Sequence, residues 1–257
     1  MEGTPAAAGR GTSMRKTIKN AVFTLLFLTL IASTALLTYL HFFASYDKEL
    51  SGEWTANLDM TQQASVTALA WLQDIEGVSV SMEDMESYMQ ELTIQVNLTL
   101  EQTARSEGTF YCNVSPESYD ACRQAAYEAF ALAFQDLLAG RLRMAGYTGS
   151  TDKEAMEALV TETFGMPTVS YLMSYGPALL PSLEDLQVGY DGSGTYKESE
   201  DILTRQFDAG GAVTTKTEYY IWKDSKLILY EEIGSVPAGL FSDYYPMVYT
   251  LKQSPNQ

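Results

Sequence analysis

An uncharged stretch of 24 residues near the N-terminus constrains this chain more than any other feature. It runs from Ala21 to Ala44 and reads AVFTLLFLTLIASTALLTYLHFFA. A helix of that length rises about 36 Å, whereas the hydrocarbon core of a bilayer is about 30 Å thick. Serine and threonine hydroxyls in such a helix can bond to carbonyls of the preceding turn, so they cost little in lipid. The sequence therefore predicts a transmembrane helix over residues 21–44, with membrane lipid as its partner.

The charges on either side of this stretch predict its orientation. Residues 1–20 carry four basic side chains against one acidic one, whereas Asp47 and Glu49 follow the stretch. By the positive-inside rule, residues 1–20 form a basic cytoplasmic tail and residues 45–257 form an extracytoplasmic domain. The alternative is a cleaved signal peptide with its processing site among the small residues 32–35. The apolar run continues well beyond those residues, which favours the single-pass cell-membrane protein.

The extracytoplasmic region is strongly acidic. Removing the four basic residues and one acidic residue of positions 1–20 from the totals of 16 and 33 leaves a net charge of about −20. Such a surface repels phosphate backbones, so nucleic acid is excluded as a partner. We interpret the acidity as a means of keeping the domain soluble.

Alternation of apolar and polar residues predicts strands at both ends of this region. The clearest example places Ile94, Val96, Leu98 and Leu100 between polar neighbours, the period of two that a half-buried strand requires. The same pattern and the intervening turn residues predict strands at residues 51–60, 109–114, 192–198, 202–207, 212–222, 226–232 and 244–251. Seven or eight antiparallel strands indicate a small β-barrel or a strongly curved sheet.

Between these strands, the spacing of apolar residues and the presence of cap residues predict helices. Ser81 with Asp84 has the pattern of a capping box, Pro116 stands at a first helical position, and Gly77 is expected to end a helix. Helices are expected at residues 62–75, 82–90, 116–144 and 151–164, with a further apolar stretch at 169–180. The predicted class is α+β, in which a helical block at about 115–188 is inserted into the barrel or lies across it as a lid.

Two segments resemble lipocalin-like domains of the calycin type. Gly52-Glu53-Trp54 has the G-x-W pattern that opens the first lipocalin strand, and GTYKESEDILTRQFDAGGAVTTKTEYYIWKDSKLILYEE is similar to the later strands of bacterial members. The resemblance implies that Trp54 packs across the closed end of a barrel. It also implies a binding or structural role rather than catalysis. As a whole, the chain looks like membrane-anchored proteins of Gram-positive gut bacteria.

The two cysteines are Cys112 and Cys122, with nine residues between them, on the outer side of the predicted anchor. Oxidation is allowed there, so we expect a disulfide that ties a hairpin to the following helix. Such a bridge would stabilise the fold by about 2 to 3 kcal/mol through loop-closure entropy. A metal pair or a redox couple is the alternative, but no histidine partners and no C-x-x-C spacing support either.

The sequence offers little for catalysis. The single histidine, His41, lies in the anchor, so no Ser-His or Cys-His pair can form in the domain. The acidic groups at 83–86, 184–185 and 198–201 occupy capping or turn positions, and Asp191 to Gly194 lacks the ligand spacing of a calcium loop. We therefore expect no enzyme activity, no catalytic residue, no metal site and no cofactor.

Three functional hypotheses follow. The favoured one is a non-enzymatic binding or structural role at the cell envelope, with an envelope protein or a ligand as partner. The first alternative is a lipocalin-like carrier of a small hydrophobic ligand, in which case Trp54, Tyr219, Trp222 and Tyr249 are the candidates to line its cavity. The second alternative is a carboxylate-based glycan hydrolase, which requires two carboxylates facing each other about 5 to 9.5 Å apart.

Overall fold

The computed structural model describes residues 25–38, 50–73, 80–209, 212–232 and 245–252. The chain divides into two units, Met1–Glu49 and Leu50–Gln257. The second unit contains the predicted strands and helices.

In the first unit, residues 25–38 are helical and their side chains are exposed. The hydroxyls of Thr29 and Thr34 donate to the carbonyl oxygens of Leu26 and Leu30, each at 2.8 Å. The expected hydroxyl-to-carbonyl bonds are thus confirmed. In the part of the chain that the structure describes, no helix combines the length and the apolar character that a membrane span requires. Residues 21–24 and 39–44, including His41, lie outside that part, so the anchor stays a prediction.

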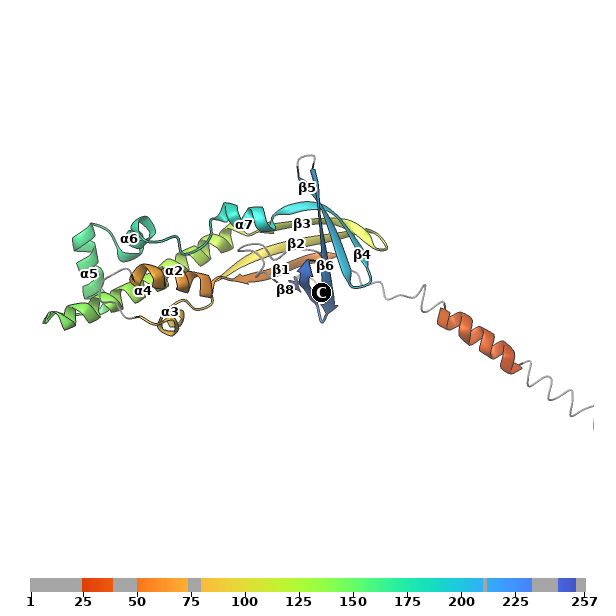
Figure 1. Ribbon diagram of the computed structural model, residues 1–257, viewed down its shortest axis with the longest axis horizontal. Coiled ribbons are helices and arrows are strands. Elements are labelled where there is room, and N and C mark those ends of the chain that lie inside the picture. The colour runs from red at the N-terminus through yellow and green to blue at the C-terminus, as the bar shows by residue number, and fades with distance from the viewer. Residues whose placement is uncertain (1–24, 39–49, 74–79, 210–211, 233–244, 253–257) are drawn as a thin grey trace, which may run out of the picture. The chain divides into compact units, whose positions relative to one another are not determined.

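The second unit is built on a closed barrel of eight antiparallel strands in simple sequential order (Figure 1). This confirms the barrel rather than an open curved sheet, and it is compatible with a lipocalin-like fold. The strands are β1 (Gly52–Asp59), β2 (Thr93–Ala104), β3 (Glu107–Val114), β4 (Gly192–Ser199), β5 (Ile202–Ala209), β6 (Ala212–Lys223), β7 (Lys226–Glu232) and β8 (Met247–Leu251).

The period-two pattern sets which side chains fill the barrel. In β2, Ile94, Val96, Leu98 and Leu100 are buried while their neighbours are more exposed. The same parity buries Phe110 and Cys112 in β3. Because every strand contributes such a face, one hydrophobic core runs from the barrel interior to the helices packed against it.

The helices enter the barrel sequence at two points. The first pair, α2 (Thr61–Gln73) and α3 (Met82–Tyr88), lies between β1 and β2. The second group lies between β3 and β4 and consists of α4 (Pro116–Met144), α5 (Lys153–Phe164), α6 (Thr168–Tyr175) and α7 (Leu183–Tyr190). Figure 1 shows α4 leaving the barrel edge, with α5 and α6 at the end of the unit that is far from β5 and β6. The helical block is therefore an insertion that extends away from the barrel.

Cap chemistry explains where several helices begin and end. Ser81 and Asp84 form the predicted capping box, and Ser115 caps α4 ahead of Pro116. The sequence analysis did not identify α7, although Ser182 accepts a hydrogen bond from the Asp185 amide at its start. Gly77, expected to end α2, lies outside the described residues.

The G-x-W segment has a defined structural role in β1. Gly52 has φ +146°, and a Cβ atom there would lie 2.6 Å from the Cδ1 of Leu251, the last residue of β8. Trp54 is 1% exposed, and its Nε1 donates to the Leu50 carbonyl at 2.9 Å. Since Trp54 is the register partner of Leu251, this segment holds the seam where β8 closes onto β1.

Replacing Trp54 with alanine tests the importance of that seam. We expect W54A to lower the free energy of unfolding by about 3–5 kcal/mol, the usual cost of truncating a fully buried aromatic side chain. The matched control is W222A, because Trp222 is 37% exposed and should cost far less. Urea unfolding of the full-length protein in non-ionic detergent, followed by circular dichroism, measures both. Equal losses for the two variants would show that the seam does not depend on Trp54.

Candidate functional site

The inner face of the barrel carries two cations opposite each other. Arg205 on β5 and Lys216 on β6 are register partners on neighbouring strands. Arg205 is buried and Lys216 is half-buried. Like charges at directly opposed positions of an antiparallel pair destabilise the sheet. A pair of this kind inside a barrel therefore needs negative charge nearby.

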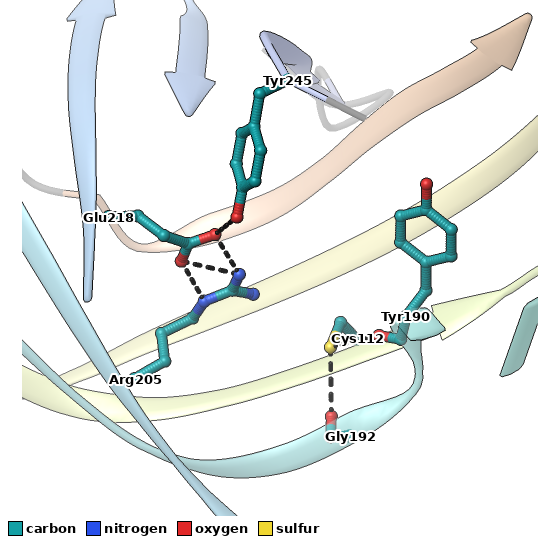
Figure 2. Close-up of polar contacts among 6 residues, drawn as sticks. All are labelled: Cys112, Tyr190, Gly192, Arg205, Glu218 and Tyr245. Carbon is teal, nitrogen blue, oxygen red and sulfur yellow. Dashed lines mark hydrogen bonds and ion pairs between the residues drawn. The ribbon is translucent and has the colours of Figure 1, made fainter. Parts of the chain in front are cut away.

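One carboxylate supplies that charge. Glu218 is 1% exposed, and its two oxygens accept bonds from Arg205 Nε at 2.8 Å and Nη2 at 2.7 Å. The Tyr245 hydroxyl donates to Glu218 Oε1 at 2.6 Å (Figure 2). Burying two charges is costly unless they are paired and hydrogen-bonded, and this geometry provides both. The charge of Glu218 therefore mainly neutralises that of Arg205, and not that of Lys216.

Aromatic rings hold the guanidinium in place. The Arg205 Cζ lies 5.6 Å from the centre of the Phe110 ring and 5.4 Å from that of Phe207. These two rings contact each other edge to face, with centroids 4.8 Å apart. Burial alone would lower the pKa of Arg205, but the charge of Glu218 outweighs it and raises that pKa. The guanidinium is therefore charged at any physiological pH.

A partly enclosed cavity of about 80 Å³ lies beside the ion pair. We call it the barrel cavity, and it is lined by Gly189, Tyr190, Arg205, Phe207, Lys216, Glu218, Tyr245, Met247 and Tyr249. These residues come from β5, β6, β8, the end of α7 and the chain just before β8. One water molecule needs a cavity volume of about 10–15 Å³. A cavity of about 80 Å³ therefore has room for roughly five waters, or for a ligand of roughly five heavy atoms.

The barrel cavity exposes hydrogen-bond donors that the protein does not use. The Tyr249 side chain is 2% exposed, and its hydroxyl bonds to none of the described residues. Burial raises the pKa of Tyr249, so the hydroxyl keeps its proton. Figure 2 shows the third guanidinium nitrogen of Arg205 turned away from Glu218. The Lys216 ammonium is a further donor in the lining. Because Arg205 and Lys216 are positive and Glu218 is negative, the lining carries one more positive than negative charge.

The expected disulfide is not formed. Cys112 and Cys122 are both free thiols and both buried. The strand parity directs Cys112 into the barrel, where its Sγ contacts the carbonyl oxygens of Tyr190 at 2.9 Å and Gly192 at 3.4 Å (Figure 2). Cys122 lies on α4 outside the barrel, and burial raises its pKa to about 11. The two side chains therefore point to different parts of the core, which spacing along the sequence does not reveal.

The structure separates the four aromatic residues proposed to line a cavity. Tyr249 lines the barrel cavity, whereas Trp54 is buried at the β1–β8 seam. Tyr219 and Trp222 are 47% and 37% exposed and do not line it. Of the four residues, only Tyr249 lines the barrel cavity.

Sequence reasoning missed Arg205, Lys216 and Glu218. The available signal was parity: Arg205 lies between Leu203 and Phe207 on positions that face inward, and Lys216, Glu218 and Tyr220 share one face of β6. Charged residues at inward positions of a predicted strand mark an interior polar site.

A larger and more open groove of about 960 Å³ lies along α4, α5 and α6. Several of its lining residues are glutamates, namely Glu128, Glu154, Glu157 and Glu162. Glu157 accepts bonds from the Thr168 amide at 3.0 Å and the Gln135 amide group at 2.6 Å. It therefore caps α6, whose own N-cap residue, Pro167, provides no side-chain bond.

Among the described residues, no three His, Cys, Asp or Glu side chains gather as a metal site would require. Comparison with protein-family models, with curated proteins and with solved structures found no match.

The ion pair provides a test of this geometry. E218Q leaves Arg205 and Lys216 without a compensating charge, so we expect a loss of about 3–5 kcal/mol in the free energy of unfolding. The double variant R205M/E218L should recover most of that loss, because an apolar pair of similar volume suits the core. The exposed pair of Glu107 and Lys197 is the control, and E107Q should change stability little. Urea unfolding that shows similar losses for E218Q and E107Q would contradict the proposed role of Glu218.

Proposed function

We propose that this chain is a membrane-anchored, lipocalin-like binding protein without enzymatic activity, and that the barrel cavity is its ligand site on the outer side of the membrane. The observation that carries the proposal is a set of donors in the lining of a partly enclosed cavity, namely the Tyr249 hydroxyl, the third Arg205 nitrogen and the Lys216 ammonium, which bond to none of the described residues. Buried polar groups normally have hydrogen-bond partners, and those that lack them within the protein point to an external one. The anchor and the orientation rest on the sequence of residues 1–49.

The size and chemistry of the barrel cavity favour a small polar ligand over a hydrophobic one. Sites for hydrophobic molecules of drug size usually measure about 300–1,000 Å³ and are lined mainly by apolar groups. The barrel cavity measures about 80 Å³ and contains an ion pair. These properties count against the carrier of a hydrophobic molecule.

The same lining counts against a glycan hydrolase. Such an enzyme needs a second carboxylate to act as acid or base beside the first. Glu218 is the one carboxylate that lines the barrel cavity, and both of its oxygens are bonded to Arg205 or Tyr245. A carboxylate held in this way is a structural group, which supports binding rather than catalysis.

Protease treatment of intact cells tests the proposed location. With one tag at the N-terminus and another at the C-terminus, we expect the C-terminal tag to be lost and the N-terminal tag to be protected, because residues 45–257 lie outside. Lysed cells are the control, since both tags should then be digested. Protection of the C-terminal tag in intact cells would contradict the location.

Ligand titration tests the proposed site. We expect members of a panel of small polar molecules (formate, acetate, acetamide, urea and glycerol) to raise the Tm of the full-length protein, because a ligand that binds only the folded state stabilises it. A fluorescent fatty acid should show no saturable binding. The variant F207W, which fills the cavity, should lose the response to the panel. Saturable fatty-acid binding, or no response to any member of the panel, would refute the proposal.

A further inference from the structure

We propose that the ligand of the barrel cavity is a small organic monoanion, a carboxylate of roughly five heavy atoms. This inference rests on the proposed function, because it names the ligand class of the same site. It was not expected from the sequence, which is acidic throughout the region beyond residue 49.

The lining of the barrel cavity has a net positive charge. Arg205 and Lys216 are positive, Glu218 is negative, and the other lining residues carry no charge at neutral pH. Asp191, the residue after α7, is exposed and does not line the cavity; it accepts a hydrogen bond from the Val114 amide at 2.7 Å. One positive charge in the lining is therefore uncompensated, and a single negative charge balances it.

Lys216 has no alternative partner among the described residues. Its ammonium forms no ion pair or hydrogen bond with the residues that the structure describes. Its register partner is the cation Arg205, so the nearest element across the sheet repels it. A ligand carboxylate in the cavity would convert this repulsion into two favourable contacts.

The unused polar groups of the lining are hydrogen-bond donors. Carboxylate oxygens accept hydrogen bonds and donate none, so they suit a lining whose unused groups are donors. The Tyr249 hydroxyl, the third nitrogen of Arg205 and the Lys216 ammonium are such groups. A neutral amide of the same shape would place an N–H group among these donors. The cavity therefore discriminates between acetate and acetamide, which differ little in size.

The limited volume decides between small and large acids. A space of about 80 Å³ holds a carboxylate with a short substituent, and the Phe207 and Met247 side chains bound it on the apolar side. A fatty acid would need the space that Phe110, Trp54 and the other core side chains occupy. We therefore assign the site to free short-chain acids.

Acetate and acetamide are the probes that test this inference on the full-length protein, at constant ionic strength with chloride as the replacing anion. We expect acetate to bind saturably in calorimetry and to raise the Tm, with acetamide at least tenfold weaker. K216Q should abolish acetate binding while it raises the Tm of the ligand-free protein, because it removes the repulsion from Arg205. Y249F should weaken acetate binding several-fold. K223Q removes an exposed lysine of the same strand and should bind acetate like the unmodified protein.

The outcomes separate this inference from the function on which it rests. Equal binding of acetate and acetamide, or acetate binding that survives in K216Q, would refute the anion while leaving a small-ligand site in place. A panel in which neither probe nor any other small polar molecule binds would refute the site itself. Loss of acetate binding in K223Q as well would show that general surface charge, rather than Lys216, attracts the anion.

Discussion

The lining of the barrel cavity contains two cations, Arg205 and Lys216, but only one carboxylate, Glu218. Arg205 takes both of its oxygens, Tyr245 adds a third bond, and Lys216 on the next strand receives none. Removing charges from water costs several kcal/mol per ion unless close partners compensate. The barrel therefore contains one cation that is fully compensated and another that depends on solvent or on a ligand. The binding chemistry that we infer follows from this difference.

The packing around the barrel cavity increases the energetic difference between the paired Arg205 and the unpaired Lys216. Apolar side chains from all parts of the barrel and from α2, α3 and α4 form one core, so the space beside the ion pair is limited to the barrel cavity of about 80 Å³. The rings of Phe110 and Phe207 fix the guanidinium, and the end of α7 places Tyr190 at the cavity wall. A low local dielectric strengthens interactions between charges and also raises the cost of leaving one unpaired. A filled barrel is thus better suited to select a small charged ligand than to carry a large apolar one.

Much of this architecture could be predicted from the sequence, because period-two alternation and cap residues are local signals. The β2 pattern, the capping box at Ser81 and the start of α4 at Pro116 all have short-range causes. The predictions that failed depend on the direction in which side chains point and on the register of neighbouring strands. Cys112 and Cys122 are close in sequence, yet one faces the barrel interior and the other belongs to α4. Arg205 and Lys216 are eleven residues apart, and only the register of β5 with β6 makes them partners.

The central claim is that a small carboxylate binds in the barrel cavity, which Lys216 and Arg205 line. The most direct measurement is an NMR titration of the full-length protein with acetate, in which all methionine methyl groups are labelled with carbon-13. Met247 lines the barrel cavity, whereas Met85 and Met89 are buried in and next to α3 and serve as internal references. We predict a saturable shift of the Met247 methyl signal alone. No shift of that signal at saturating acetate, or a parallel shift of all three, would contradict the claim.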